Sequence, residues 1–245
     1  MSPALLSPTL EANLARVRTR IDAAARRSGR SGDSVALVAV TKSVDPAVAA
    51  DLARLGQLDL GESRADELER KHRRLAAEGL RPRWHFVGHL QGNKVRRVIA
   101  IASSIHSIDS PALLEAVDRA AALAGARPEI WIQAKLSDEP AKTGAARGEV
   151  ARLFARALSL ANVRVQGLMA IAPLVAGPDG EAAARRTFRE LAALARELAR
   201  SEGMGDALRS GSVRTSMGMS GDFEWAIEEG SDLVRVGSLL FEHEA

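Results

Sequence analysis

Strand-like and helix-like segments alternate eight times along the chain, and this alternation constrains the fold more than any other feature. The strand-like runs are short, apolar and rich in β-branched residues, as in VALVAV at 35–40, which is typical of strands buried on both faces. Parallel strands need crossover connections of about a dozen residues or more, and helices supply them. Eight such units in 245 residues predict an α/β fold of the (β/α)8 TIM barrel type. A doubly wound open sheet is the competing fold.

The elements are expected at defined places. The strands should cover residues 35–40, 58–61, 84–90, 104–108, 129–136, 163–171, 212–217 and 233–240. An extra N-terminal helix at 8–28 should precede the first strand, and further helices should cover 46–55, 64–77, 111–124, 148–159, 179–202 and 222–229, with another beginning at 93. No composition shift or linker divides the chain, so we expect a single domain over 1–245, with a flexible terminus at 1–7.

Composition excludes several function classes. The chain has no cysteine, which excludes disulfides, thiolate metal sites and a cysteine nucleophile. It has no apolar run of transmembrane length and no signal peptide at its start, so a cytoplasmic protein without a membrane partner is expected. Basic clusters at Lys71–Arg74 and Lys94–Arg97 are interpreted as solvated helix faces. Aromatic residues are only 3% and the net charge is +3, so no nucleic-acid partner is expected.

In a barrel of this kind, function lies at the carboxyl ends of the strands. Lys42 follows the first strand directly, where an apolar setting would favour the neutral amine that bonds to an aldehyde. A salt bridge or exposure to solvent is the alternative for this lysine. Two glycine-containing turns, Ser216–Gly221 and Gly237-Ser238, follow the last two strands, and barrels commonly bind phosphate there.

Two further sets of polar residues lie in strand-like runs. Arg235 interrupts the apolar run LVRVG, and a buried guanidinium needs a partner. That partner is either a carboxylate such as Glu62 or an acceptor on a ligand. His85 and His89 would share one face of a strand, but no third ligand accompanies them, so no metal site is expected.

Several long segments resemble a known family. They are AVTKSVDPAVAADLARLGQLDLGESRADEL, WHFVGHLQGNKVRRV, IHSIDS, GLMAIAP and SMGMSGDFEWAIEEGSDLVRVGSLLF, and they resemble the pyridoxal 5′-phosphate (PLP) homeostasis proteins, the YggS/PROSC family. The resemblance runs over about residues 10–242. It implies a barrel similar to the N-terminal domain of alanine racemase, with PLP as cofactor, held as an internal aldimine on Lys42.

The resemblance also implies the other binding residues. Phosphate would be held by Ser216, Gly218, Gly237 and Ser238, while Arg235 would face the pyridine nitrogen. The family commonly has Gly-Glu-Asn where this chain has Gly-Glu-Ser, so a cofactor contact from Ser63 is in doubt, because serine is the shorter side chain. The complete predicted cofactor set is Lys42, Ser63, Ser216, Met217, Gly218, Arg235, Gly237 and Ser238, and no catalytic residue is predicted. Lys142 matches a family lysine without an assigned role.

The expected function is to hold and release PLP rather than to catalyse a reaction. Arginine does not give up its proton, so it leaves the ring nitrogen a weak electron sink. Related racemases use a tyrosine from a second domain, and this chain has no tyrosine. Partners would be PLP, apo PLP-dependent enzymes and free amino acids, and a monomer is expected. The alternatives are a PLP-dependent racemase or related amino-acid enzyme using His85 or Lys142 as base, a lysine aldolase acting on sugar phosphates, and a regulatory binding protein.

Overall fold

The computed structural model describes residues 8–137, 143–173, 179–201, 208 and 211–242. Eight parallel strands form a closed barrel, because β1 pairs with β9 and β4 pairs with β5. The barrel strands are β1 (Ala36–Val40), β2 (Asp59–Glu62), β3 (Arg83–Phe86), β4 (Ser104–Ile108), β5 (Glu129–Lys135), β7 (Arg164–Met169), β8 (Arg214–Ser216) and β9 (Leu233–Val236). The two-residue strand β6 (Ala145–Ala146) adds to β5 outside this ring. The predicted (β/α)8 TIM barrel is therefore confirmed, and the open sheet is excluded.

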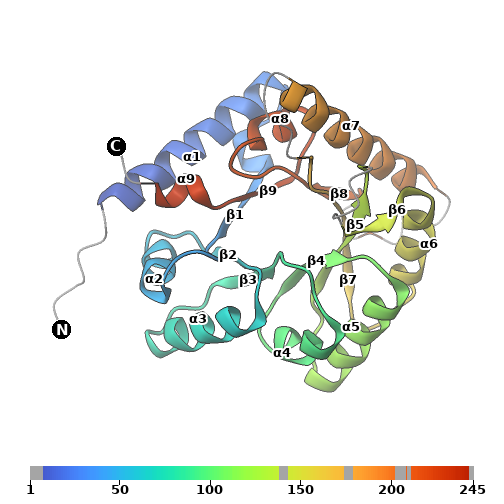
Figure 1. The fold of residues 1–245 in the computed structure, drawn as a ribbon, viewed down its shortest axis with the longest axis horizontal. Helices are drawn as coiled ribbons and strands as arrows, with labels where there is room; N and C mark the ends of the chain where they lie inside the picture. The colour runs from blue at the N-terminus through green and yellow to red at the C-terminus, as the bar shows by residue number, and fades with distance from the viewer. Residues whose placement is uncertain (1–7, 138–142, 174–178, 202–207, 209–210, 243–245) are drawn as a thin grey trace.

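Helices surround the strands (Figure 1). They are α1 (Pro8–Arg27), α2 (Pro46–Arg54), α3 (Ala65–Ala77), α4 (Val95–Ile99), α5 (Pro111–Ala124), α6 (Arg147–Leu158), α7 (Asp179–Arg200), α8 (Phe223–Glu228) and α9 (Ser238–Phe241), with 3₁₀ turns η1 (Gly32–Ser34) and η2 (Gly92–Lys94). Local sequence explains several boundaries. Proline opens α2 and α5, where its missing N–H costs nothing, and Gly125 ends α5 at a φ of 60°. None of the helices in the described ranges combines the length and apolar character needed to cross a membrane.

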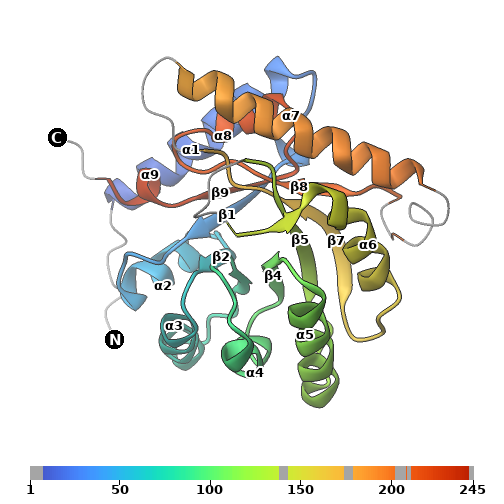
Figure 2. The same cartoon turned by 45° about the vertical axis from the view of Figure 1, so that its right-hand side comes forward.

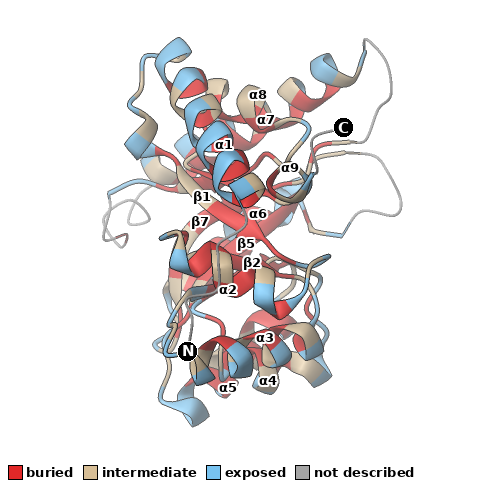
Figure 3. Ribbon diagram, turned by 90° about the vertical axis from the view of Figure 1, so that its left-hand side faces the viewer, coloured by how far each residue is buried: buried red, intermediate tan, exposed pale blue. Residues whose placement is uncertain are grey.

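Apolar side chains pack in two layers. The larger lies between strands and helices, and the exposed faces of the helices point outward (Figure 3). A smaller cluster fills the barrel interior and contains Val38, Val40, Trp131, Met169 and Leu233. The extra N-terminal helix α1 buries Leu10, Leu14, Val17 and Ile21. It packs beside α8 and α9 on the outside of the strand barrel (Figure 2).

Two expectations about strands were wrong in extent. The third predicted strand was to run to residue 90, but β3 ends at Phe86. The eighth was to run to 240, but Gly237 leaves the extended conformation and residues 238–241 form α9. An apolar run cannot by itself distinguish a strand from a buried helical turn, and LVRVGSLLF is such a run. The two-residue β6 was not expected. The flexible terminus predicted at 1–7 lies outside the described residues.

Candidate functional site

The sequence-predicted residues meet at one end of the barrel. Strands β8, β9, β1 and β2 are consecutive neighbours in the sheet, and all are parallel. Lys42 and Ser63 follow β1 and β2, while Ser216 ends β8 and Arg235 lies in β9. Carboxyl ends of neighbouring parallel strands lie at the same edge of a sheet, so four separate stretches of sequence contribute to one site.

Lys42 is exposed in the turn that follows β1. The apolar setting expected for it from the preceding strand was wrong, because the burial ends with Thr41, which is completely buried. The backbone of this turn is nevertheless held in place. Thr41 N–H donates to the Gly61 carbonyl at 2.9 Å, and Val44 N–H donates to the Thr41 carbonyl at 3.1 Å. The amine of Lys42 is therefore accessible at the mouth of the barrel on a fixed backbone.

A buried ion pair lies directly beneath this turn. Lys71 Nζ contacts Glu62 Oε1 at 2.5 Å, and both side chains have no exposed surface. Lys71 also donates to the Thr41 carbonyl at 2.5 Å, and Thr41 Oγ1 donates to Glu62 Oε1 at 2.7 Å. Glu62 therefore does not pair with Arg235, and Lys71 does not belong to a solvated face; both of those interpretations were wrong. The signal for Lys71 was present in its spacing, since it lies three residues after Leu68 and four before Leu75 on the apolar stripe of α3.

Arg235 is a buried cation whose described acceptors are neutral. Its side chain is among the buried groups, with 5% of the residue exposed. Nη1 donates to Ser216 Oγ at 2.6 Å and Nη2 donates to the Ala170 carbonyl at 3.1 Å. Burial lowers the pKa of Arg235 to about 10, although the charge of Asp222 acts to raise it. The guanidinium therefore keeps its charge at neutral pH.

Two turns form a glycine-lined edge beside Arg235. Gly218 has a φ of +95°, and a Cβ there would lie 2.6 Å from the Ala226 Cβ, so no other residue fits. Its carbonyl accepts the Arg235 N–H at 3.0 Å. Gly237 N–H donates to Ser220 Oγ at 3.1 Å, which joins the turn after β8 to the turn after β9. Ser220 was missed in the sequence, although it lies within the SMGMSG run that was singled out.

The remaining predicted residues take different positions. Met217 is completely buried in the helix-facing core, and its backbone N–H and carbonyl are already bonded to Leu233 and Ser231. Ser238 is exposed at the first position of α9, where helical N–H groups have no partner within the helix. Ser63 is half-buried, and a Cβ on Gly88 would lie 2.2 Å from its carbonyl. The turns after β2 and β3 are therefore in close contact. Lys142 lies outside the described residues.

The two histidines do not share a face. His85 is buried in β3, whereas His89 lies beyond the strand with 52% of its side chain exposed, 3.9 Å from Asp109. Both ring nitrogens of His85 are engaged: Nε2 with Asp59 Oδ1 at 2.9 Å and Nδ1 with His106 Nε2 at 3.0 Å. His106 was not singled out in the sequence, because the run IHSID indicates a strand but not the partners of its side chains.

The residues present fit a phosphorylated aldehyde on three observations. An accessible amine, that of Lys42, lies at the mouth. A glycine edge, at Gly218 and Gly237, allows close backbone approach. A buried cation, Arg235, has neutral partners among the described contacts and would gain from an anionic or electron-rich ligand. Together they define a candidate site for a small ligand with a phosphate group.

Comparison with known proteins defines the class first. Residues 12–244 match the family model described as alanine racemase, N-terminal domain. The pyridoxal phosphate homeostasis protein of Aquifex aeolicus is 36% identical over 228 residues, which cover 93% of this chain and 95% of that relative. This chain therefore belongs to the family of pyridoxal phosphate homeostasis proteins.

Solved structures agree with this membership. The structure of PipY from Synechococcus elongatus with PLP bound is 31% identical, with a TM-score of 0.82, and covers 95% of this chain and 100% of that one. Alanine racemase from Streptomyces lavendulae is 22% identical with a TM-score of 0.67, covering 96% of this chain and 57% of that one. The second likeness concerns the fold alone.

Proposed function

We propose that this protein binds PLP at the carboxyl ends of β8, β9, β1 and β2 and takes part in PLP homeostasis. The observation that carries the proposal is Arg235, a buried guanidinium that donates to neutral oxygens beside a glycine-lined edge. A buried charge whose described hydrogen-bond acceptors are neutral is costly, and an electron-rich ligand would offset that cost. The PLP bound to PipY and the name of the Aquifex relative support PLP as that ligand.

Each predicted residue has a role in this proposal. The amine of Lys42 would bond reversibly to the aldehyde of PLP, and Arg235 would donate toward the ring nitrogen. Gly218 and Ser238 would offer backbone N–H groups to the phosphate, as glycine-rich turns do. Gly237, whose N–H donates to Ser220 Oγ, would allow the phosphate to approach the backbone closely. The remaining members of the set would act from close by: Ser216 would hold Arg235, Met217 would pack beneath the turn, and Ser63 would line the mouth.

Holding and delivering PLP is favoured over catalysis by the residues around it. Bound PLP supplies an electron sink for amino-acid chemistry when its ring nitrogen is protonated, and an arginine donor opposes that protonation. His85 has both ring nitrogens engaged inside the barrel, which leaves it unsuited as a racemase base. We propose apo PLP-dependent enzymes as recipients, free amino acids as agents of release, and a cytoplasmic monomer as the working form.

The binding test is an absorption spectrum after reconstitution with PLP. Wild-type protein should develop a visible band that free PLP and apo protein lack, and Lys42→Ala should not. Lys135→Ala is the matched control, because Lys135 also lies at the carboxyl end of a strand, β5. A band that persists in Lys42→Ala would show that PLP is attached elsewhere than at Lys42. A wild-type protein without a band would refute PLP binding through a lysine.

Delivery is tested separately from binding. Loaded protein is mixed with an apo PLP-dependent enzyme, and the recovery of that enzyme's activity is followed with and without an added amino acid. Recovery should be faster with the amino acid, because its amine competes with Lys42 for the aldehyde. PLP that stays bound under excess amino acid would contradict the delivery role while leaving binding intact. Accumulation of D-amino acid or keto acid would favour an enzyme.

A further inference from the structure

A continuous chain of hydrogen bonds crosses the interior of the barrel. It runs from Asp59 on β2 through His85 on β3 and His106 on β4 to Ser216 on β8, and it ends at Arg235 on β9. The four links measure 2.9, 3.0, 3.0 and 2.6 Å in that order. Five separate strands contribute one residue each. One end of this hydrogen-bonded chain is the carboxylate of Asp59, and the other is the guanidinium of Arg235.

The two ends fix the direction of the outermost bonds. A guanidinium only donates, and a carboxylate only accepts. Asp59 must receive a hydrogen, so His85 carries one on Nε2. In the arrangement that runs one way along the chain, Nδ1 of His85 accepts. His106 then donates from Nε2 and accepts on Nδ1, so the hydroxyl hydrogen of Ser216 points at His106. A lone pair of Ser216 is thereby left facing Arg235, which donates to it.

The surroundings of His106 keep its imidazole neutral. His106 has no exposed surface, and burial lowers its pKa well below the ordinary value, with the charge of Arg235 acting in the same direction. Trp131 stacks on the ring of His106, with centroids 5.2 Å apart and an angle of 16°. Its indole N–H donates to Ser104 Oγ at 3.1 Å, and Ser104 Oγ lies 3.4 Å from His106 Nε2. The ring of His106 is therefore fixed in position as well as in charge.

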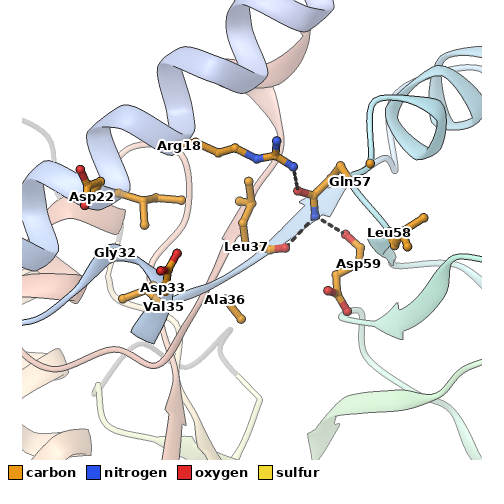
Figure 4. Close-up of a pocket in the computed structure, with 12 residues that line it drawn as sticks. Arg18, Asp22, Gly32, Asp33, Val35, Ala36, Leu37, Gln57, Leu58 and Asp59 are labelled. Atoms are coloured by element: carbon orange, nitrogen blue, oxygen red, sulfur yellow. Dashed lines mark hydrogen bonds between the residues drawn. The ribbon is translucent and has the colours of Figure 1, made fainter.

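The Asp59 end opens at the face of the barrel opposite to Lys42. Asp59 is the first residue of β2, and 31% of its side chain is exposed. It lines a cavity of about 630 Å³ together with Arg18, Asp22 and Gln57. Figure 4 shows Asp59 at the edge of this cavity, with its backbone carbonyl accepting from Gln57. Asp59 therefore lies at the amino ends of the strands, whereas the predicted cofactor residues lie at their carboxyl ends.

We propose that Asp59, His85 and His106 are positioning residues for the cofactor site, because their one-way chain of hydrogen bonds fixes the acceptor that orients Arg235. The expected effect on PLP affinity rests on the proposed function, whereas the arrangement of the hydrogen bonds concerns the protein alone. While its own hydrogen is bound to His106, Ser216 presents its lone pairs to Arg235 in one orientation. Removing Asp59 removes the group that sets the direction, and both histidines can then exchange tautomers.

The first arm of the test uses the apo protein labelled with ¹⁵N-histidine. Ring ¹⁵N shifts distinguish a protonated from an unprotonated nitrogen, and His106→Gln identifies the His106 signals. Wild type should show His106 neutral with its hydrogen on Nε2, and Asp59→Ala should lose this single tautomer. Ser107→Ala is the matched control, because Ser107 lies on the same strand as His106, is 1% exposed and has an Oγ without a partner in the described structure. A wild-type His106 with its hydrogen on Nδ1 would overturn the proposal, as would an unchanged tautomer in Asp59→Ala.

The second arm measures PLP affinity. Asp59→Ala should bind PLP about 2- to 12-fold more weakly, the value of one lost net hydrogen bond, whereas Ser107→Ala should match wild type. Asp59→Asn keeps an acceptor oxygen and should restore both tautomer and affinity, which separates positioning from a general loss of stability. An Asp59→Ala protein with an altered tautomer and wild-type affinity would overturn the positioning role. If wild type shows the expected tautomer but binds no PLP, the proposed function fails, and the arrangement of the chain stands.

Discussion

Replacing Lys71 by methionine should strongly destabilise the protein, because it leaves the Glu62 carboxylate buried without its counter-charge. Both side chains are fully buried, and their charged atoms are 2.5 Å apart. Glu62 would retain only the hydroxyl of Thr41 on Oε1, while Oε2 already has no partner in the described structure. Breaking one partner of a buried pair costs about 3–5 kcal/mol. For a chain of this length that corresponds to a fall in Tm of roughly 6–10 °C.

The assay is equilibrium unfolding in urea together with a thermal scan, on Lys71→Met, Glu62→Leu and the double variant. The double variant should be closer to wild type than the sum of the two single losses, because it removes both charges and leaves Thr41 Oγ1 bonded to the Gly61 carbonyl. Arg26→Met is the control, since it removes the exposed pair with Asp22, which contributes less than about 1 kcal/mol.

Two results would refute this reasoning. A loss below about 1 kcal/mol in Lys71→Met would mean that the pair behaves like one at the surface. Single losses that add within about 0.5 kcal/mol in the double variant would mean that the two charges do not interact. Because Lys71 also holds the Thr41 carbonyl, Lys71→Met should in addition weaken PLP binding at the neighbouring Lys42.

Three further changes have expected outcomes. Gly218→Ala should abolish PLP binding and lower Tm, because its φ of +95° and the 2.6 Å approach to Ala226 leave no room for a Cβ; titration with PLP and a thermal scan check this, and normal binding would contradict it. Arg235→Met should leave the apo protein as stable as wild type or more so, because it removes a buried charge, while PLP affinity falls; a large loss of apo stability would contradict it. Folded His106 stays neutral, while the unfolded chain binds a proton below about pH 6.5, so this residue makes stability decrease as the pH is lowered, by up to about 1.4 kcal/mol per pH unit. His106→Gln should flatten this dependence in urea unfolding between pH 5 and 6.5, and an unchanged slope would contradict the prediction.

The fold was predictable because it depends on a repeated local pattern. Strand and helix alternation fixes the barrel, and prolines and glycines mark where helices begin and end. What sequence could not fix were positions where one pattern has two structural solutions. The run around Gly237 became a strand followed by a helical turn, and WHFVGHL ended as a strand at Phe86.

The site was predictable where a motif carries it and not where partners come from distant strands. Lys42, Arg235 and the two glycine turns meet as neighbouring strand ends. The partner of Arg235 was not predicted, because hydrogen bonds across a barrel join residues far apart in the chain, such as His106 and Ser216. Burial of Lys71 followed from helical spacing, but its charge directed the interpretation toward solvent.

The most direct test of PLP attachment is reduction followed by peptide mapping. Protein loaded with PLP is treated with borohydride, which makes the bond between a lysine amine and the aldehyde permanent, and is then digested and analysed by mass spectrometry. The account predicts one modified peptide, which contains Lys42, and none in Lys42→Ala. Modification of a different lysine, or of several lysines equally, would contradict it.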